Sequence, residues 1–169
     1  MNQAKKAEQI ARQAHKKQKR RSGVPYITHA EAVVQYLIKN YTELFPKDAY
    51  KGNWMDPEVK DCVIAAAWMH DVVEDTDWTI EMLKKEGFKP LTYELVDMLT
   101  RKKGETYFAF IMRIHNGGNP PNEPCGAFRV GATAIKLSDL WHNMTDSPSE
   151  GSRLDKYRFA KYILSYFNN

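Results

Sequence analysis

The residues best able to do chemistry are concentrated in segment 68–75, which follows an apolar stretch. A helix that is apolar all round belongs in a core, where charged side chains are costly unless paired or bound to a metal. On a helix, His70 and Glu74 share one face, and Asp71 and Asp75 share the next. Adjacent His and Asp suit a divalent metal, and the acidic pair suits proton transfer or water positioning. An acidic, solvated turn at a helix end is the alternative interpretation.

Residues far from this segment could complete a metal site. His29 lies at the start of one predicted helix, and Asp139 lies late in another. With His70 and Asp71 they offer two imidazoles and two carboxylates, a set that suits Mn²⁺, Fe²⁺ or Zn²⁺ with open positions for water. A lone histidine near a helix end is more often a hydrogen-bonded structural residue. Residue types and spacing therefore permit a metal site without requiring one.

The elements that would position these residues are predicted to be helices. Apolar residues recur at three- and four-residue spacing, and period-2 alternation is nearly absent, which predicts an all-α fold of about seven to eight helices. Thr28 and Asp56 are predicted N-caps, and Gly87 is a predicted helix stop. Residues 42–56 and 116–126 are predicted loops. The predicted helices cover approximately residues 4–19, 28–41, 57–73, 79–86, 93–100, 108–115, 127–144 and 154–167.

Length and composition predict an ordinary globular domain. The 169 residues favour one domain over 1–169, large enough to bury about 70% of its unfolded surface. The two cysteines form no disulfide framework or zinc motif, which favours a reducing compartment. No apolar run is long enough to span a membrane, and no apolar signal segment follows the N-terminus. We therefore expect a cytoplasmic protein without membrane contact.

Positive charge is concentrated near the N-terminus. The formal net charge is only +4, but residues 16–21 contain five cations. Such a run can bind phosphates or nucleic acid. It is also typical of a solvated helix end, where cations interact favourably with the helix dipole. The moderate net charge and the absence of a longer basic stripe disfavour a nucleic-acid partner.

Four segments form an ordered set of motifs: Ala14-His15-x-x-Gln18, Arg20-Arg21-Ser22-Gly23-x-Pro25-Tyr26-x-x-His29, His70-Asp71-x-x-Glu74-Asp75-Thr76 and Lys136-Leu137-Ser138-Asp139-x-x-His142-Asn143-Met144. In this order they resemble the hydrolase domain of the RelA/SpoT alarmone enzymes and the stand-alone small alarmone hydrolases. These proteins are HD-domain metal-dependent phosphohydrolases with the ligand order H…HD…D. The resemblance covers about residues 10–145 and implies one compact HD-type helical domain.

The resemblance implies roles for individual residues. Four match the metal ligands: His29, His70, Asp71 and Asp139. The family metal is typically Mn²⁺, with Fe²⁺ or Zn²⁺ as alternatives. Glu74 and Asp75 match the pair that positions and deprotonates the attacking water. Four others match groups that contact the substrate: Arg20, Arg21, Ser22 and Asn143.

Other positions do not match a functional role or depart from the family pattern. His15 and His142 do not match ligands and are interpreted as structural, and His115 is unmatched. Val24 replaces the usual acid before Pro-Tyr, and Leu140 replaces the arginine that usually follows the last ligand. Loop 116–126 resembles an insertion ahead of the helix that carries Asp139. These departures bear on which substrate the site accepts.

The implied function is hydrolysis of the 3′-pyrophosphate of (p)ppGpp to GDP or GTP and pyrophosphate. The alternatives are a phosphohydrolase acting on another nucleotide, such as a dNMP, an NADPH-like 2′-phosphate or a cyclic dinucleotide, and a non-catalytic nucleotide sensor. The retained acidic pair, Glu74 and Asp75, argues against a sensor, because binding alone does not need it. The expected partner is a small nucleotide, and the sequence does not indicate an oligomeric state.

Overall fold

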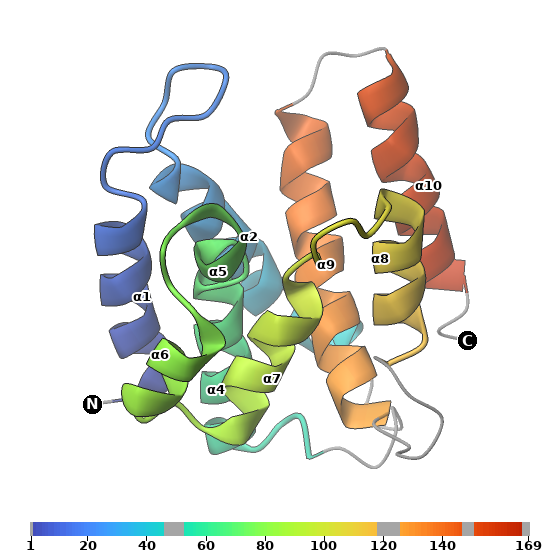
Figure 1. Ribbon diagram of the computed structural model, residues 1–169. Helices are drawn as coiled ribbons and strands as arrows, with labels where there is room; N and C mark the ends of the chain where they lie inside the picture. The colour runs from blue at the N-terminus through green and yellow to red at the C-terminus, as the bar shows by residue number, and fades with distance from the viewer. Residues whose placement is uncertain (1, 46–52, 118–125, 147–150, 167–169) are drawn as a thin grey trace.

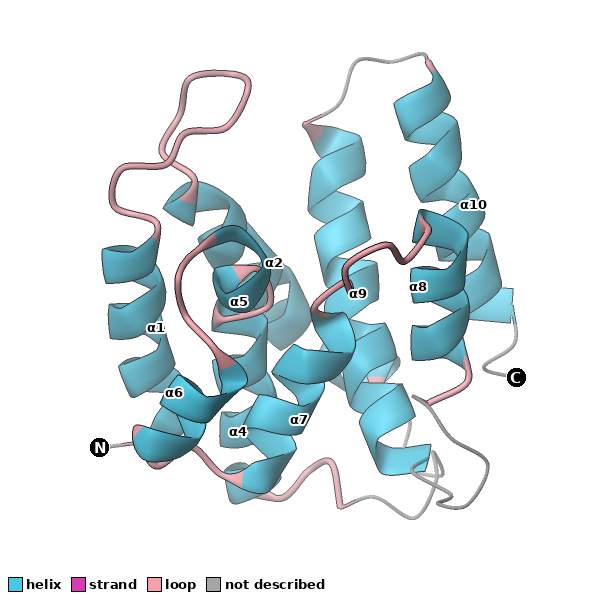
Figure 2. Cartoon of the chain, in the orientation of Figure 1, coloured by secondary structure: helices cyan, strands magenta, loops and turns pink. Residues whose placement is uncertain are grey.

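The computed structural model describes residues 2–45, 53–117, 126–146 and 151–166, and this part of the chain contains ten helices and no named strand (Figures 1 and 2). The all-α prediction is confirmed. The helices are α1 (Gln3–Ala14), α2 (Ile27–Lys39), α3 (Tyr41–Leu44), α4 (Pro57–Trp68), α5 (Val72–Asp75), α6 (Ile80–Lys85), α7 (Pro90–Leu99), α8 (Tyr107–His115), α9 (Gly126–Thr145) and α10 (Ser152–Tyr166). Seven helices have nine residues or more, and three are shorter; of these, α6 matches the predicted helix 79–86, whereas α3 and α5 were not predicted as separate helices.

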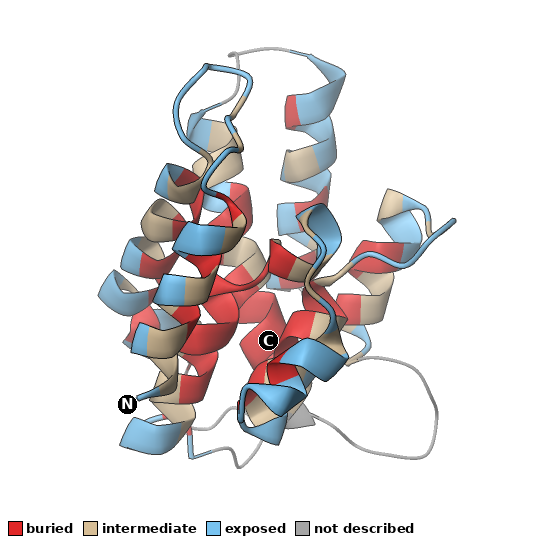
Figure 3. Ribbon diagram, turned by 60° about the vertical axis from the view of Figure 1, so that its left-hand side comes forward, coloured by how far each residue is buried: buried red, intermediate tan, exposed pale blue. Residues whose placement is uncertain are grey.

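Helix α4 is the centre of the core. Asp56 caps it by accepting the backbone N–H groups of Glu58 and Val59, and Pro57 occupies the first turn, as predicted. Its alanines present little bulk, so α1, α2, α7 and α9 all pack against it. Six residues of α4 are buried, and Figure 3 shows that buried residues are concentrated in the interior of the helical assembly. In the described part of the chain, no helix combines the length and apolar character needed to cross a bilayer.

Helix α9 joins the two sides of the molecule. It packs against α2 and α7 on one side and α8 and α10 on the other (Figure 1). At Gly131 the contact with α7 is close, since an added Cβ would lie 2.9 Å from Leu95 Cδ2, a fully buried side chain. This close approach fixes the position of α9, which carries Asp139 and Asn143, relative to the core.

The predicted helix 57–73 is interrupted. Helix α4 ends at Trp68, a turn containing His70 and Asp71 follows, and α5 is a separate turn of helix. The prediction of one continuous helix over 57–73 was therefore wrong. The interruption is stabilised locally, because Nδ1 of His70 lies 2.8 Å from the carbonyl oxygen of Ala67. It directs His70 and Asp71 together toward α2 and α9.

The connection between α1 and α2 also differs from the prediction. Helix α1 ends at Ala14 rather than near Lys19, which instead forms an isolated antiparallel bridge with Pro25. Thr28 does not cap α2; its hydroxyl donates to the carbonyl of Pro25 over 2.8 Å. The predicted stop at Gly87 is confirmed, with a positive φ just after α6. Most of loop 116–126 lies outside the described residues.

Candidate metal centre and active site

Four side chains predicted to bind a metal converge in the interior. His29 comes from α2, His70 and Asp71 from the turn after α4, and Asp139 from α9. His29 Nε2 lies 3.1 Å from Asp139 Oδ1 and 3.6 Å from Asp71 Oδ2. His70 Nε2 lies 3.1 Å from Asp71 Oδ2 and 3.3 Å from His29 Nε2. The structure thus brings together residues far apart in the sequence.

The donor set fits a divalent cation. His29, His70 and Asp139 are buried and offer ligand atoms that all lie within 4.8 Å of one another. The Nε2 atoms of the two histidines face each other. If both atoms presented only a lone pair, the contact would be repulsive. A proton or a cation is required between them. Mixed imidazole and carboxylate ligands suit Mn²⁺, Fe²⁺ or Zn²⁺.

The protonation of the metal-free cluster follows from its charges. Burial opposes the charged form of His70, but the carboxylates of Asp71 and Asp139 outweigh burial and raise its pKa to about 9. Burial likewise opposes the charged form of Asp139, yet Lys136 and the histidines hold the pKa of this carboxyl below its usual value. Lys136 Nζ lies 2.7 Å from Asp139 Oδ2. Burial also opposes the charged form of Asp71, yet His70 and His29 hold the pKa of this carboxyl below its usual value. Both carboxylates are therefore ionised at neutral pH and available as ligands.

The predicted acidic pair lies on α5, beside the four converging residues. Glu74 Oε2 accepts the backbone N–H of Arg101 over 2.9 Å. Partial desolvation, with the nearby charges of Asp71 and Glu74, raises the pKa of Asp75 above its usual value. Glu74, a carboxylate held in place, suits water positioning. Asp75, a carboxylate with a raised pKa, suits proton transfer.

Of these groups, all but His70 line one cavity of about 260 Å³. Helices α8 to α10 and the segment between α7 and α8 add cations and tyrosines to its lining that were not predicted as site residues: Arg101, Tyr107, Lys136, Lys156 and Tyr157. The hydroxyl of Tyr107 is buried without a hydrogen-bond partner among the described residues. A buried unsatisfied donor beside lysines points to an anionic ligand. The position of Lys136, three residues before Asp139, was the one available sequence signal.

The predicted substrate-binding residues separate into two groups. Arg20 Nη2 lies 3.2 Å from Asn143 Oδ1, and its Nε lies 2.8 Å from Asp146. Asn143 also lines the cavity and donates to Asp139 over 2.5 Å. Arg21 and Ser22 are exposed in the turn that follows Arg20, and neither lines the cavity.

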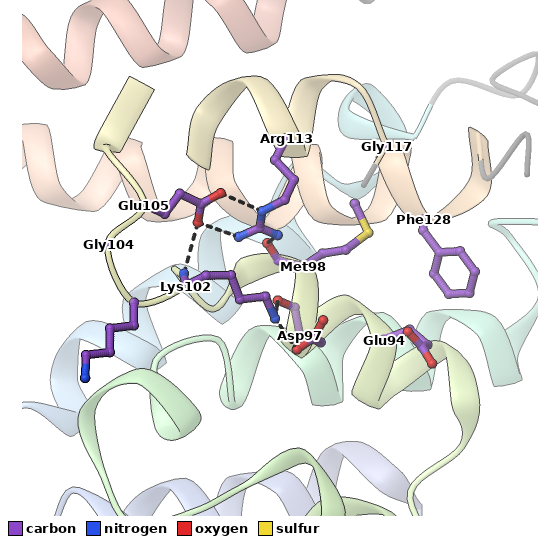
Figure 4. A pocket seen from close by; sticks show the side chains of 10 residues that line it. Glu94, Asp97, Met98, Lys102, Gly104, Glu105, Arg113, Gly117 and Phe128 are labelled. Atoms are coloured by element: carbon purple, nitrogen blue, oxygen red, sulfur yellow. Dashed lines mark hydrogen bonds and ion pairs between the residues drawn. The ribbon is translucent and has the colours of Figure 1, made fainter. Parts of the chain in front are cut away.

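Arg113 holds the segment that carries Arg101. Its guanidinium donates to both carboxylate oxygens of Glu105, at 2.8 and 2.9 Å (Figure 4). It also donates to the carbonyls of Met98 and Thr100, at 2.9 and 3.0 Å. These groups line a second, charged cavity of about 590 Å³. Because the backbone N–H of Arg101 donates to Glu74, this bonding also holds Glu74 in place.

We expect Arg113→Leu to destabilise the protein by about 3 kcal/mol, because the largely buried Glu105 carboxylate and two carbonyls lose their donors. Urea unfolding measures the change. Arg158→Leu is the matched control, since its ion pair with Asp155 is exposed and contributes about 0–1 kcal/mol. Equal effects of the two substitutions would contradict the role of Arg113.

Comparisons with known proteins find relatives for most of the chain. No family model matches the chain. It is 38% identical over 160 residues to a guanosine-3′,5′-bis(diphosphate) 3′-pyrophosphohydrolase of Haemophilus influenzae, covering 94% of this chain and 20% of the relative. It is 34% identical over 151 residues to a GTP pyrophosphokinase of Streptomyces coelicolor, covering 85% of this chain and 14% of the relative. The chain thus spans a fifth or less of these two relatives.

A solved structure supports the fold. It is that of a metazoan ortholog of SpoT described as hydrolysing ppGpp. The TM-score is 0.68 at 22% sequence identity, and the alignment covers 100% of this chain and 86% of that chain. At this identity the likeness establishes the helical architecture.

Proposed function

We propose that this chain, which is RelA/SpoT hydrolase-like in its sequence and its fold, is a metal-dependent phosphohydrolase that removes the 3′-pyrophosphate of (p)ppGpp. The observation that carries the proposal is the convergence of His29, His70, Asp71 and Asp139 on the cavity lined by Glu74 and Asp75. The first four would hold one divalent ion, with Mn²⁺ as the expected metal. A small nucleotide is the expected partner.

The acidic pair would handle the attacking water. When bound, the metal supplies Lewis-acid polarisation of a phosphate oxygen and of water. Asp75, whose pKa is raised, accepts the proton of the attacking water, and Glu74, held by Arg101, orients that water. The water oxygen bonds to the phosphorus attached to O3′, the P–O3′ bond breaks, and O3′ takes up a proton. The products are pyrophosphate and GDP or GTP.

The cations of the cavity lining would bind the charged substrate. Lys136 and Lys156 lie on the cavity with Arg101 and can offset phosphate charge as it develops. Asn143, held between Arg20 and Asp139, faces the same space. Water attack then occurs between an acidic side that accepts a proton and a basic side that holds the phosphates.

The direct test is incubation of the Mn²⁺-loaded protein with ppGpp, pppGpp, dNMPs, NADPH and a cyclic dinucleotide, with products resolved by chromatography. Pyrophosphate and GDP from ppGpp are the expected result. Turnover of another nucleotide alone would keep the phosphohydrolase and reject the alarmone substrate. Tight ppGpp binding without turnover would instead identify a sensor.

We expect Tyr107→Phe to change substrate affinity and stability in opposite senses. The substitution removes a donor for phosphate and should raise KM about 3- to 10-fold. It also removes a buried hydroxyl that has no partner among the described residues, and so should raise the melting temperature. Steady-state kinetics and thermal melts measure the two effects. Tyr93→Phe, outside the cavity lining, is the control, and an unchanged KM in Tyr107→Phe would contradict phosphate binding.

Metal binding should depend on pH with a defined sign. The pKa of His70 is about 9 in the metal-free fold, above its unfolded value of about 6.5. The stabilisation that follows from this shift is fully present below about pH 6.5 and is lost as the pH rises through about 9. A metal requires neutral His70, so between pH 6.5 and 9 its binding displaces a proton. Mn²⁺ affinity should therefore rise up to about tenfold per pH unit in this range.

Calorimetric titrations at several pH values, in buffers of different ionisation enthalpy, measure the affinity and the released proton. At 100 times the dissociation constant, Mn²⁺ should stabilise the fold by about 2.7 kcal/mol, and EDTA should reverse the effect. Affinity that is independent of pH over this range would contradict His70 as a ligand.

A further inference from the structure

His142 contacts His29, one of the four converging residues, through one ring nitrogen of each side chain. Nδ1 of His142 lies 2.8 Å from Nδ1 of His29, and the ring centroids are 4.9 Å apart. His142 follows Asp139 by three residues on α9, so the two side chains share one face of that helix. Both therefore approach His29 from α9. From the sequence alone, His142 was interpreted as structural, and nothing in the pattern indicated its contact with His29.

The short nitrogen–nitrogen distance determines where the protons lie. A hydrogen bond between two ring nitrogens needs one donor and one acceptor. Nε2 of His29 faces Asp139 and His70, so it must keep its lone pair to bind a cation. A neutral imidazole has one N–H, which in His29 must then be on Nδ1. His142 Nδ1 is consequently the acceptor, and His142 carries its own proton on Nε2.

The other histidine of the centre is oriented by a different group. His70 Nδ1 lies 2.8 Å from the carbonyl oxygen of Ala67, so a backbone acceptor fixes its tautomer and ring direction. The acceptor for His29 is a side chain. Second partners of this kind set the orientation and basicity of ligating histidines, and their loss typically costs 10- to 100-fold in metal affinity. In this centre, the partner of His29 can be changed by substitution.

We propose that His142 is a positioning residue for the metal centre: its Nδ1 accepts the Nδ1–H of His29 and so directs Nε2 of His29 at a divalent cation. The inference rests on the proposed metal site. It assigns His142 no contact with substrate and no place among the ligands. Its effect is on how strongly His29 binds the ion.

Two substitutions separate the acceptor from the bulk of the side chain. His142→Asn places an amide oxygen near the position of Nδ1 and keeps an acceptor, whereas His142→Leu fills similar space without one. We expect the dissociation constant for Mn²⁺ to stay within about threefold of wild type in His142→Asn and to rise about 10- to 100-fold in His142→Leu. His115→Leu, the same change in α8, should leave Mn²⁺ binding unchanged.

Melting temperatures of the metal-free variants show whether a difference in affinity comes from misfolding. A packing role alone would lower stability without separating Asn from Leu in Mn²⁺ affinity. If His142→Leu does not fold, ¹⁵N-histidine NMR of the Zn²⁺-loaded wild type decides. The expected spectrum has His29 protonated at Nδ1 and His142 at Nε2. The opposite tautomers would overturn the proposal.

Titration with Mn²⁺ alone keeps this test separate from the test of the proposed activity. A wild-type protein that binds Mn²⁺ and hydrolyses no nucleotide would refute the proposed reaction, while the Asn and Leu comparison still decides the role of His142. Equal Mn²⁺ affinity in wild type, His142→Asn and His142→Leu would overturn the inference. Absence of Mn²⁺ binding in the wild type would overturn both the metal site and the inference.

Discussion

Asp71→Asn should lower the turnover of ppGpp by about 1,000-fold, which corresponds to about 4 kcal/mol of transition-state stabilisation. The amide keeps the size of the carboxylate and an oxygen that can accept the hydroxyl of Tyr26, its present donor. It removes the negative charge that faces Nε2 of His29 and of His70. Mn²⁺ affinity should fall together with kcat, because the charge helps to hold the ion. Steady-state kinetics and calorimetry measure the two quantities.

A matched control for Asp71→Asn is Asp97→Asn. Asp97 is exposed on α7, where it pairs with Lys102 at 2.5 Å, and it does not line the metal-site cavity. We expect its turnover and Mn²⁺ affinity to equal those of wild type. Wild-type Mn²⁺ affinity in Asp71→Asn would show that this carboxylate is not a ligand.

Asp75→Asn should lower kcat by about 10²- to 10⁴-fold, because the attacking water loses its proton acceptor. Mn²⁺ affinity should change little, since Asp75 is outside the group of four converging residues. The pH profile adds a second readout. The carboxylate is active when ionised, so the wild-type rate should fall as pH decreases through the raised pKa of Asp75. This acid limb should be absent from the residual activity of the variant.

Two other substitutions test the assignment of the proton acceptor. Asp77→Asn changes an exposed acid just beyond α5 and should leave kcat unchanged. Glu74→Gln keeps an oxygen that can accept the N–H of Arg101, so it should cost less than Asp75→Asn. A larger loss in Glu74→Gln than in Asp75→Asn would transfer the role of base to Glu74.

Helical spacing predicted the elements but not all of their ends. The apolar pattern located α4 and its cap, because Asp56 and Pro57 act through local geometry. The interruption after Trp68 has no glycine or proline to mark it. The location of this interruption depends on the positions of α2 and α9, since the turn directs His70 toward these helices. Such tertiary effects are absent from the local sequence pattern.

Only some of the cavity residues could be predicted from sequence motifs, because others reach the cavity through tertiary packing. The order of motifs brought His29, His70, Asp71 and Asp139 to attention, and the structure places them together. Lys156 and Tyr157 belong to no motif, and only the packing of α10 against α8 and α9 brings α10 to the cavity. The metal identity, the single domain over 1–169 and the cytoplasmic location stay predictions.

The interruption between α4 and α5 has a consequence for the order of folding. His70 and Asp71 lie in this interruption. The residues they meet are His29 on α2, which precedes them in the sequence, and Asp139 on α9, which follows them. A chain emerging from the ribosome would have His29, His70 and Asp71 long before Asp139. We therefore expect the ion to bind late in folding, after long-range packing has formed, and to stabilise a fold that is already assembled.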